Sequence, residues 1–166
     1  MLYSGMKKQG FTLIEMLIYI AVLTLATSAA VVTLISLRTV LERNRVERQL
    51  TDAATSILER FVREVRGAKG VGISGGLLQL NQTPTTTSFY LSGSDVKVRT
   101  QVGGSVLSDY PLDPPSVVVS NLSFTEYTGT STSSAVRVSF TLSVTGSRAS
   151  TTKMFGTTAV ARGSYE

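Results

Sequence analysis

The stretch Lys7-Lys8-Gln9-Gly10-Phe11-Thr12-Leu13-Ile14-Glu15-Met16-Leu17 determines how the rest of the chain is interpreted. It passes from two basic residues, through a glycine, into an apolar run that continues to Leu37 and contains one charged residue, Glu15. About 20 apolar residues in a helix cross the roughly 30 Å hydrocarbon core of a bilayer. The segment 11–37 is therefore predicted to be a transmembrane helix, with Lys7 and Lys8 on the cytoplasmic side.

Glu15 is unusual for such a helix. A carboxylate inside a membrane helix costs about 2.5–3.5 kcal/mol on insertion scales, so residues of this kind usually have a function and a partner. A cleaved secretory signal fits poorly, because the apolar run exceeds the usual length of about 7–15 residues, although small residues at 26–30 offer a cleavage site. A plain signal anchor explains every feature of the segment except Glu15.

The residues around Glu15 resemble the class III signal of prepilins, which has a short basic leader, a glycine, a hydrophobic residue and then a glutamate four positions further on. The close resemblance covers residues 7–37. It implies a leader peptide of residues 1–10, cleavage by a prepilin peptidase between Gly10 and Phe11, and N-methylation of Phe11. It also implies that Glu15 guides subunit assembly by attracting the N-terminal amine of a neighbouring subunit, since paired charges offset each other's desolvation.

Neither glycine nor proline interrupts residues 11–66, which predicts one continuous helix. Beyond residue 37 the helix becomes amphipathic. Apolar residues recur there at spacings of three and four, namely Val46, Leu50, Ala53, Ile57, Phe61 and Val65, with Ala54, Leu58 and Val62 beside them. This pattern predicts that the half 38–66 packs on the rest of the chain, and that the helix stops at Gly67 and Gly70.

Residues 67–166 have the pattern of a β-rich globular domain. The clearest strand is 136–144, where apolar and polar residues alternate strictly. Further strands are predicted at 77–80, 89–91, 96–100, 117–119, 122–127 and 153–161. Residues 109–115 are predicted to form a loop because they contain three prolines, and 128–134 a polar hairpin loop. The predicted fold class is α+β and pilin-like, a long N-terminal helix with a membrane half and an amphipathic half, packed on an antiparallel β-sheet domain.

The composition of this 166-residue chain argues against catalysis. It has no cysteine and no histidine, which removes thiolate metal sites and the commonest general base. We expect no cofactor, no metal site and no enzymatic activity. The net charge of +5, partly due to the two lysines of the leader, is too weak to indicate nucleic acid as a partner. Gly70, Gly72 and Gly75 spell G-x-G-x-x-G, but they follow a helix, so we interpret them as a helix stop and a flexible turn.

These features predict a structural subunit of a type IV pilus or type II secretion-like filament, most like a minor pilin or pseudopilin. Its expected partners are a prepilin peptidase, other pilin or pseudopilin subunits, the inner-membrane assembly platform and the lipid bilayer. We expect a single-pass inner-membrane protein with its C-terminal domain outside the cytoplasm, which enters an envelope filament on assembly. Two alternatives stay open: a membrane-anchored extracytoplasmic binding module, and a competence pilin for DNA uptake.

Overall fold

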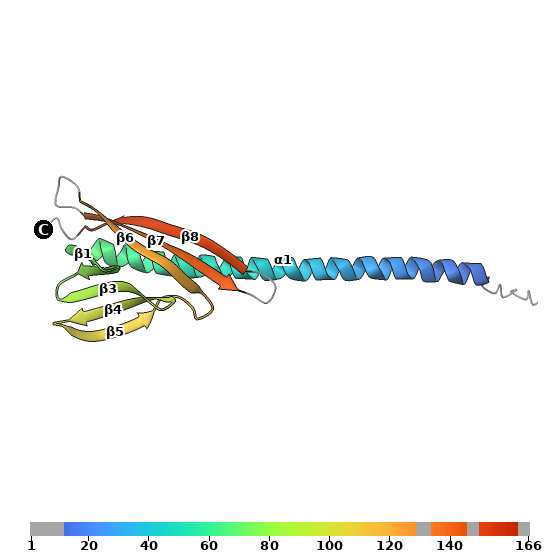
Figure 1. The fold of residues 1–166 in the computed structure, drawn as a ribbon, viewed down its shortest axis with the longest axis horizontal. Helices are drawn as coiled ribbons and strands as arrows, with labels where there is room; N and C mark the ends of the chain where they lie inside the picture. The colour runs from blue at the N-terminus through green and yellow to red at the C-terminus, as the bar shows by residue number, and fades with distance from the viewer. Residues whose placement is uncertain (1–11, 129–133, 146–149, 163–166) are drawn as a thin grey trace, which may run out of the picture. The chain divides into compact units, whose positions relative to one another are not determined.

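The computed structural model describes residues 12–128, 134–145 and 150–162. These residues form one helix and eight strands (Figure 1). The elements are α1 (Leu13–Gly67), β1 (Gly70–Ser74), β2 (Leu77–Asn81), β3 (Thr85–Ser92), β4 (Asp95–Val102), β5 (Ser105–Pro111), β6 (Val118–Thr128), β7 (Ser134–Thr145) and β8 (Ser150–Val160). The chain divides into two compact units, Met1–Leu41 and Glu42–Glu166, and α1 continues from one into the other. A long N-terminal helix with antiparallel sheets confirms the predicted α+β class.

In the first unit, α1 carries apolar side chains on its outside. Every residue from 12 to 41 is exposed except Glu15, which is half-buried. Leu25, for example, is 71% exposed. A helix satisfies its backbone hydrogen bonds internally, so apolar side chains of this kind are compatible with lipid or with other helices. This part of α1 is long and apolar enough to cross a membrane.

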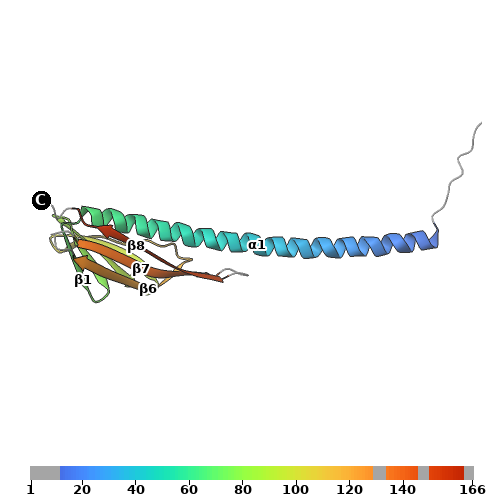
Figure 2. The ribbon, with the colours of Figure 1, turned by 90° about the horizontal axis from the view of Figure 1, so that it is seen from above.

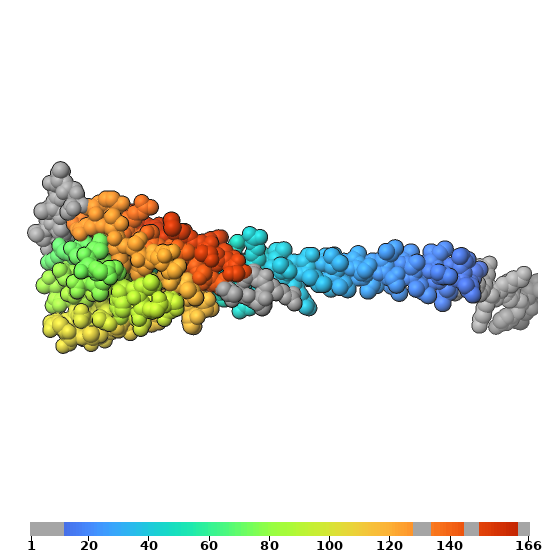
Figure 3. All heavy atoms as spheres, in the orientation of Figure 1, coloured from blue at the N-terminus to red at the C-terminus, as the bar shows by residue number. Residues whose placement is uncertain are grey.

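In the second unit, α1 buries the stripe that the sequence predicted. Val46, Leu50, Ala53, Ala54, Ile57, Phe61 and Val65 are all buried, and Leu58 and Val62 are partly buried against the same core. The strands lie beside this part of α1 in two perpendicular views (Figures 1 and 2), and they cover it on the face seen in Figure 3. The helix ends at Gly67, at the predicted stop.

The first five strands form one antiparallel sheet in the order β1-β2-β3-β4-β5. The first strand corrects a prediction, because Gly70 and Gly72 lie in β1, paired with β2, and not in a flexible turn. Val71, between the two glycines, packs against the core, and this burial of an apolar side chain stabilises the strand. The turn to β2 uses Gly75 and Gly76, whose φ values of 57° and 79° suit glycine best.

The edge strand β5 corrects the predicted loop at 109–115, since it continues to Pro111. A proline is tolerated there because β5 is the outermost strand of the sheet. Side chains of the two preceding strands hold β5 in place. The hydroxyl of Tyr90 donates to the carboxylate of Asp109 at 2.8 Å, and Nη2 of Arg99 donates to the same carboxylate at 2.8 Å. The hydrogen bond from Arg99 lowers the pKa of Asp109.

The last three strands form a second antiparallel sheet, in the order β6-β7-β8. The strictly alternating strand is β7, in which Val136, Val138, Phe140, Leu142 and Val144 are buried. The two predicted strands at 117–119 and 122–127 fall largely into one, β6. Its pairing shifts between Ser120 and Ser123, around Asn121 with a φ of 54°. Such a bulge bends a strand without ending it. Most of the predicted hairpin loop, 129–133, lies outside the described residues.

The two sheets and the helix share one core. The ring of Phe61 on α1 lies 6.1 Å from that of Phe89 on β3, edge-on, and 6.4 Å from that of Phe124 on β6, stacked. The backbone also joins the sheets, because the N–H of Val119 donates to the carbonyl of Ser94 at 2.8 Å. The second half of α1 is therefore part of the β-domain's core.

Candidate functional site

The candidate site lies at the start of α1, where the sequence placed Gly10, Phe11 and Glu15. Gly10 and Phe11 lie outside the described residues, so the predicted cleavage and methylation positions stay predictions. Glu15 is described and lies in the first turn of α1.

Thr12 caps the helix. The backbone N–H of Glu15 donates to Oγ1 of Thr12 at 3.3 Å, and the N–H of Met16 donates to the carbonyl of Thr12 at 3.2 Å. Thr-x-x-Glu at a helix start is the pattern of a capping box. Motif-based reasoning missed this signal, although the sequence shows it at 12–15. A carboxylate in the first turn also interacts favourably with the helix dipole, so Glu15 has a local role at the helix start.

The carboxylate of Glu15 meets Tyr19. The Tyr19 hydroxyl donates to Oε1 of Glu15 at 3.2 Å, from a position one helical turn further on. This contact fits the partial burial of Glu15 among exposed neighbours. Sequence reasoning missed Tyr19 as well. The available signal was the spacing of four between the only two polar side chains from Leu13 to Leu23.

The hydroxyl side chains deeper in this part of α1 bond to their own helix. Thr24, Thr27, Ser28, Thr33 and Ser36 each donate to a carbonyl three or four residues earlier, at 2.7 to 3.0 Å. Hydroxyls bonded in this way leave no unsatisfied donor facing lipid. Glu15 is thus the one charged group of the apolar segment, and its carboxylate needs a partner other than the helix backbone.

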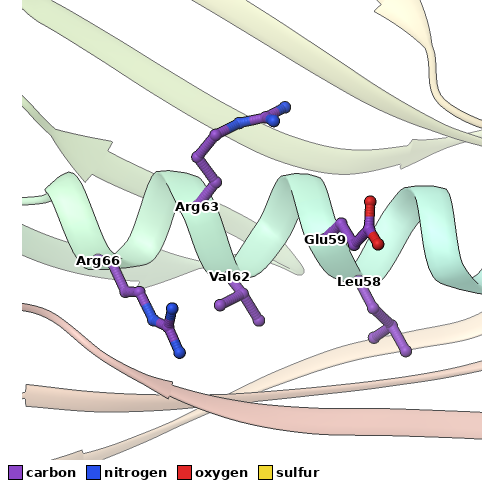
Figure 4. A pocket seen from close by; sticks show the side chains of 5 residues that line it. All are labelled: Leu58, Glu59, Val62, Arg63 and Arg66. Carbon is purple, nitrogen blue, oxygen red and sulfur yellow. The ribbon is translucent and has the colours of Figure 1, made fainter.

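The second unit has a surface groove along α1. Leu58, Glu59, Val62, Arg63 and Arg66 line about 500 Å³ of space. Figure 4 shows Leu58, Val62 and Arg66 pointing to one side of the helix and Arg63 to the other. All five residues come from one helix, whereas ligand sites usually join polar groups from several elements. Within the described ranges, no group of acidic residues is placed to hold a metal ion.

Among the described residues of the second unit, Asp113 is a buried carboxylate. It is 7% exposed, and its Oδ1 accepts a hydrogen bond from the N–H of Val96 at 2.8 Å, while Oδ2 has no hydrogen-bond partner in the part of the chain that the structure describes. Burial raises the pKa of Asp113, and the hydrogen bond from Val96 offsets part of this rise. The bond fastens the loop after β5 to the second residue of β4, so the role of Asp113 is structural.

Comparison with protein-family models matches residues 5–31 to the prokaryotic N-terminal methylation motif. The chain carries the type IV pilin signature. The matched segment contains Gly10, Phe11 and Glu15, together with Thr12 and Tyr19. Searches of curated proteins and of solved structures give no significant match. The pilin-like assignment therefore rests on the N-terminal segment, and the long N-terminal helix with an antiparallel β-domain is consistent with it.

Proposed function

We propose that this chain is a structural subunit, a minor pilin or pseudopilin, of a type IV pilus or type II secretion-like filament. A prepilin peptidase removes residues 1–10 by cutting between Gly10 and Phe11, and the new terminal amine is methylated. The apolar part of α1 holds the subunit in the inner membrane, with the β-domain outside the cytoplasm. On assembly, this part of α1 packs among the helices of neighbouring subunits.

The observation that supports this proposal most strongly is the position of Glu15, at the start of an exposed apolar helix and inside the matched motif. A helix that serves only as an anchor can be capped without a charge, and a charged carboxylate there costs free energy in lipid. In a filament, the carboxylate of one subunit attracts the terminal ammonium of another, and each charge offsets the other's desolvation. Because Glu15 also lies in a capping box, an experiment has to separate its charge from its capping role.

Processing is tested by intact-mass spectrometry of the full-length chain after co-expression with a prepilin peptidase. The expected product begins at Phe11 and is heavier by one methyl group. Gly10→Val is the matched control and should stay uncut. Glycine has no side chain to hinder binding of the backbone in the peptidase cleft, whereas the branched side chain of valine would hinder it. An uncut wild-type chain, or one cut within 26–30, would refute the proposal.

Assembly is tested with Glu15→Gln, since glutamine suits the same position of a capping box but has no charge. The variant should be inserted and processed like the wild type. Its share in sheared filaments should fall at least tenfold, which corresponds to the loss of about 1.4 kcal/mol. Glu59→Gln makes the same chemical change at an exposed site of the second unit and should leave assembly intact. Normal assembly of Glu15→Gln would reduce Glu15 to a helix cap, whereas absence of the wild-type chain from filaments would favour the anchored binding module.

A further inference from the structure

The assembly role proposed for Glu15 leaves Tyr19 unexplained. The two side chains are four residues apart in an otherwise apolar stretch, and the Tyr19 hydroxyl donates to Oε1 of Glu15 at 3.2 Å. In lipid, a phenol hydroxyl and a carboxylate both lose their hydration and both need a hydrogen-bond partner. The pair meets both needs within one subunit.

We propose that Tyr19 is a positioning residue for Glu15. Its hydroxyl keeps the carboxylate directed along the helix, within reach of the amine of an incoming subunit. This inference rests on the proposed function, because it concerns how the same carboxylate is presented before assembly.

The helix cap leaves the carboxylate available for this role. Oγ1 of Thr12 accepts a hydrogen bond from the backbone N–H of Glu15, so this half of the capping box does not involve the Glu15 carboxylate. A carboxylate has two oxygens with about four acceptor positions, and Tyr19 occupies one of them, on Oε1. An ammonium group from a neighbour therefore has room to bind while Tyr19 stays in place.

Removing the hydroxyl changes where the charge resides. A charged side chain one turn from a helix end turns toward the interface when nothing holds it in the apolar region. One turn of helix is about 5.4 Å, so this movement takes the carboxylate several ångströms from its position beside Tyr19. An incoming amine would then have to recapture the carboxylate from water.

Tyrosine is also common at membrane interfaces because of its ring, so the ring and the hydroxyl have to be tested separately. Tyr19→Phe keeps the ring and removes only the hydroxyl. Hydrogen bonds within membrane proteins contribute about 0.6 kcal/mol on average and at most about 1.7, so the share of Tyr19→Phe in filaments should fall about threefold, and by no more than about twentyfold. Thr24→Val is the control, since it removes a hydroxyl bonded to the carbonyl of Ala21, and it should leave incorporation unchanged.

A double-mutant cycle decides whether Tyr19 acts through Glu15. With Glu15→Gln already present, Tyr19→Phe should cause no further loss, because the charged acceptor is gone. Incorporation of Tyr19→Phe at the wild-type level, or the same loss in both backgrounds, would overturn the proposal. An equal loss in both backgrounds would show that the Tyr19 hydroxyl acts through its other surroundings and not through the Glu15 carboxylate.

Solid-state NMR tests the contact itself on the unassembled full-length chain in lipid bilayers. A cross-peak is expected between Cδ of Glu15, assigned by its absence in Glu15→Gln, and Cζ of Tyr19. Absence of this cross-peak would contradict the inference whatever the chain assembles into. If the cross-peak is present but the chain is neither cut by the prepilin peptidase nor found in filaments in the assays above, the filament function is refuted and the contact is retained, so the two failures can be told apart.

Discussion

Phe61 is the side chain whose removal should damage the β-domain most. It is 1% exposed and lies against Phe89 and Phe124, one from each sheet. Phe→Ala in a core costs about 3–5 kcal/mol, through lost transfer free energy and the cavity left behind. Aromatic pairs add about 0.5–1.5 kcal/mol each, so Phe61→Ala should fall in the upper part of that range, near 4–5 kcal/mol. This is a large share of a typical unfolding free energy of about 5–15 kcal/mol.

The assay is urea unfolding of the full-length chain in mild detergent, followed by circular dichroism of the β-strands. Phe155→Ala provides the matched control, because Phe155 is half-buried on β8 and stacks on Phe140 at 6.2 Å. It should lower the unfolding free energy by less than half as much as Phe61→Ala. If Phe155→Ala proves equally or more damaging, Phe61 is not the centre of the core that α1 shares with both sheets.

Two further changes test the second unit. Gly156→Ala should cost about 1–3 kcal/mol, because its Cβ would lie 2.9 Å from the carbonyl oxygen of Val138; an unchanged melting temperature would show that β7 and β8 separate easily. Asp113 should destabilise the domain as pH rises, since burial raises its pKa above the ordinary 3.8. Its contribution to stability is complete below 3.8 and is lost as pH rises through the folded-state pKa. The stability of the wild type relative to Asp113→Asn, measured by urea unfolding at acidic and neutral pH, should therefore fall with pH, and a constant difference would contradict the burial of the charge.

The buried face of α1 could be predicted residue by residue. From Val46 to Val65, each apolar residue of the predicted stripe is buried or partly buried. The prediction succeeds because a helix repeats every 3.6 residues and neither glycine nor proline disturbs that repeat. Only local geometry is needed to tell which side chains face the same way.

The edge strands β1 and β5 could not be predicted in this way. β1 contains two glycines, and its pairing depends on the turn that Gly75 and Gly76 make into β2. β5 ends at a proline and is held by bonds from Tyr90 and Arg99, which lie 19 and 10 residues from Asp109. Contacts across that separation leave no periodic signal in the sequence. The division into two sheets is equally non-local.

At the site, the motif predicted Glu15 but not the residues that act on it. A motif records residue types in order, whereas a cap and a side-chain bond depend on where the helix begins. Once α1 is seen to start after Thr12, both the cap and the meeting of Glu15 with Tyr19 follow from helical geometry. The pattern Thr-x-x-Glu and the spacing of four were both visible in the sequence, but they carry meaning only with the helix start fixed.

The first part of α1 has to be stable in two surroundings under the proposed function, lipid before assembly and neighbouring helices after it. Its hydroxyls are bonded to its own carbonyls and favour neither state, while its apolar side chains gain van der Waals packing against neighbouring helices. Glu15 differs under the proposed function, because in lipid its carboxylate has Tyr19, whereas in a filament it would also gain an ammonium group. Under the proposed function, the electrostatic part of the free-energy difference between membrane and filament therefore lies in the first two turns of α1.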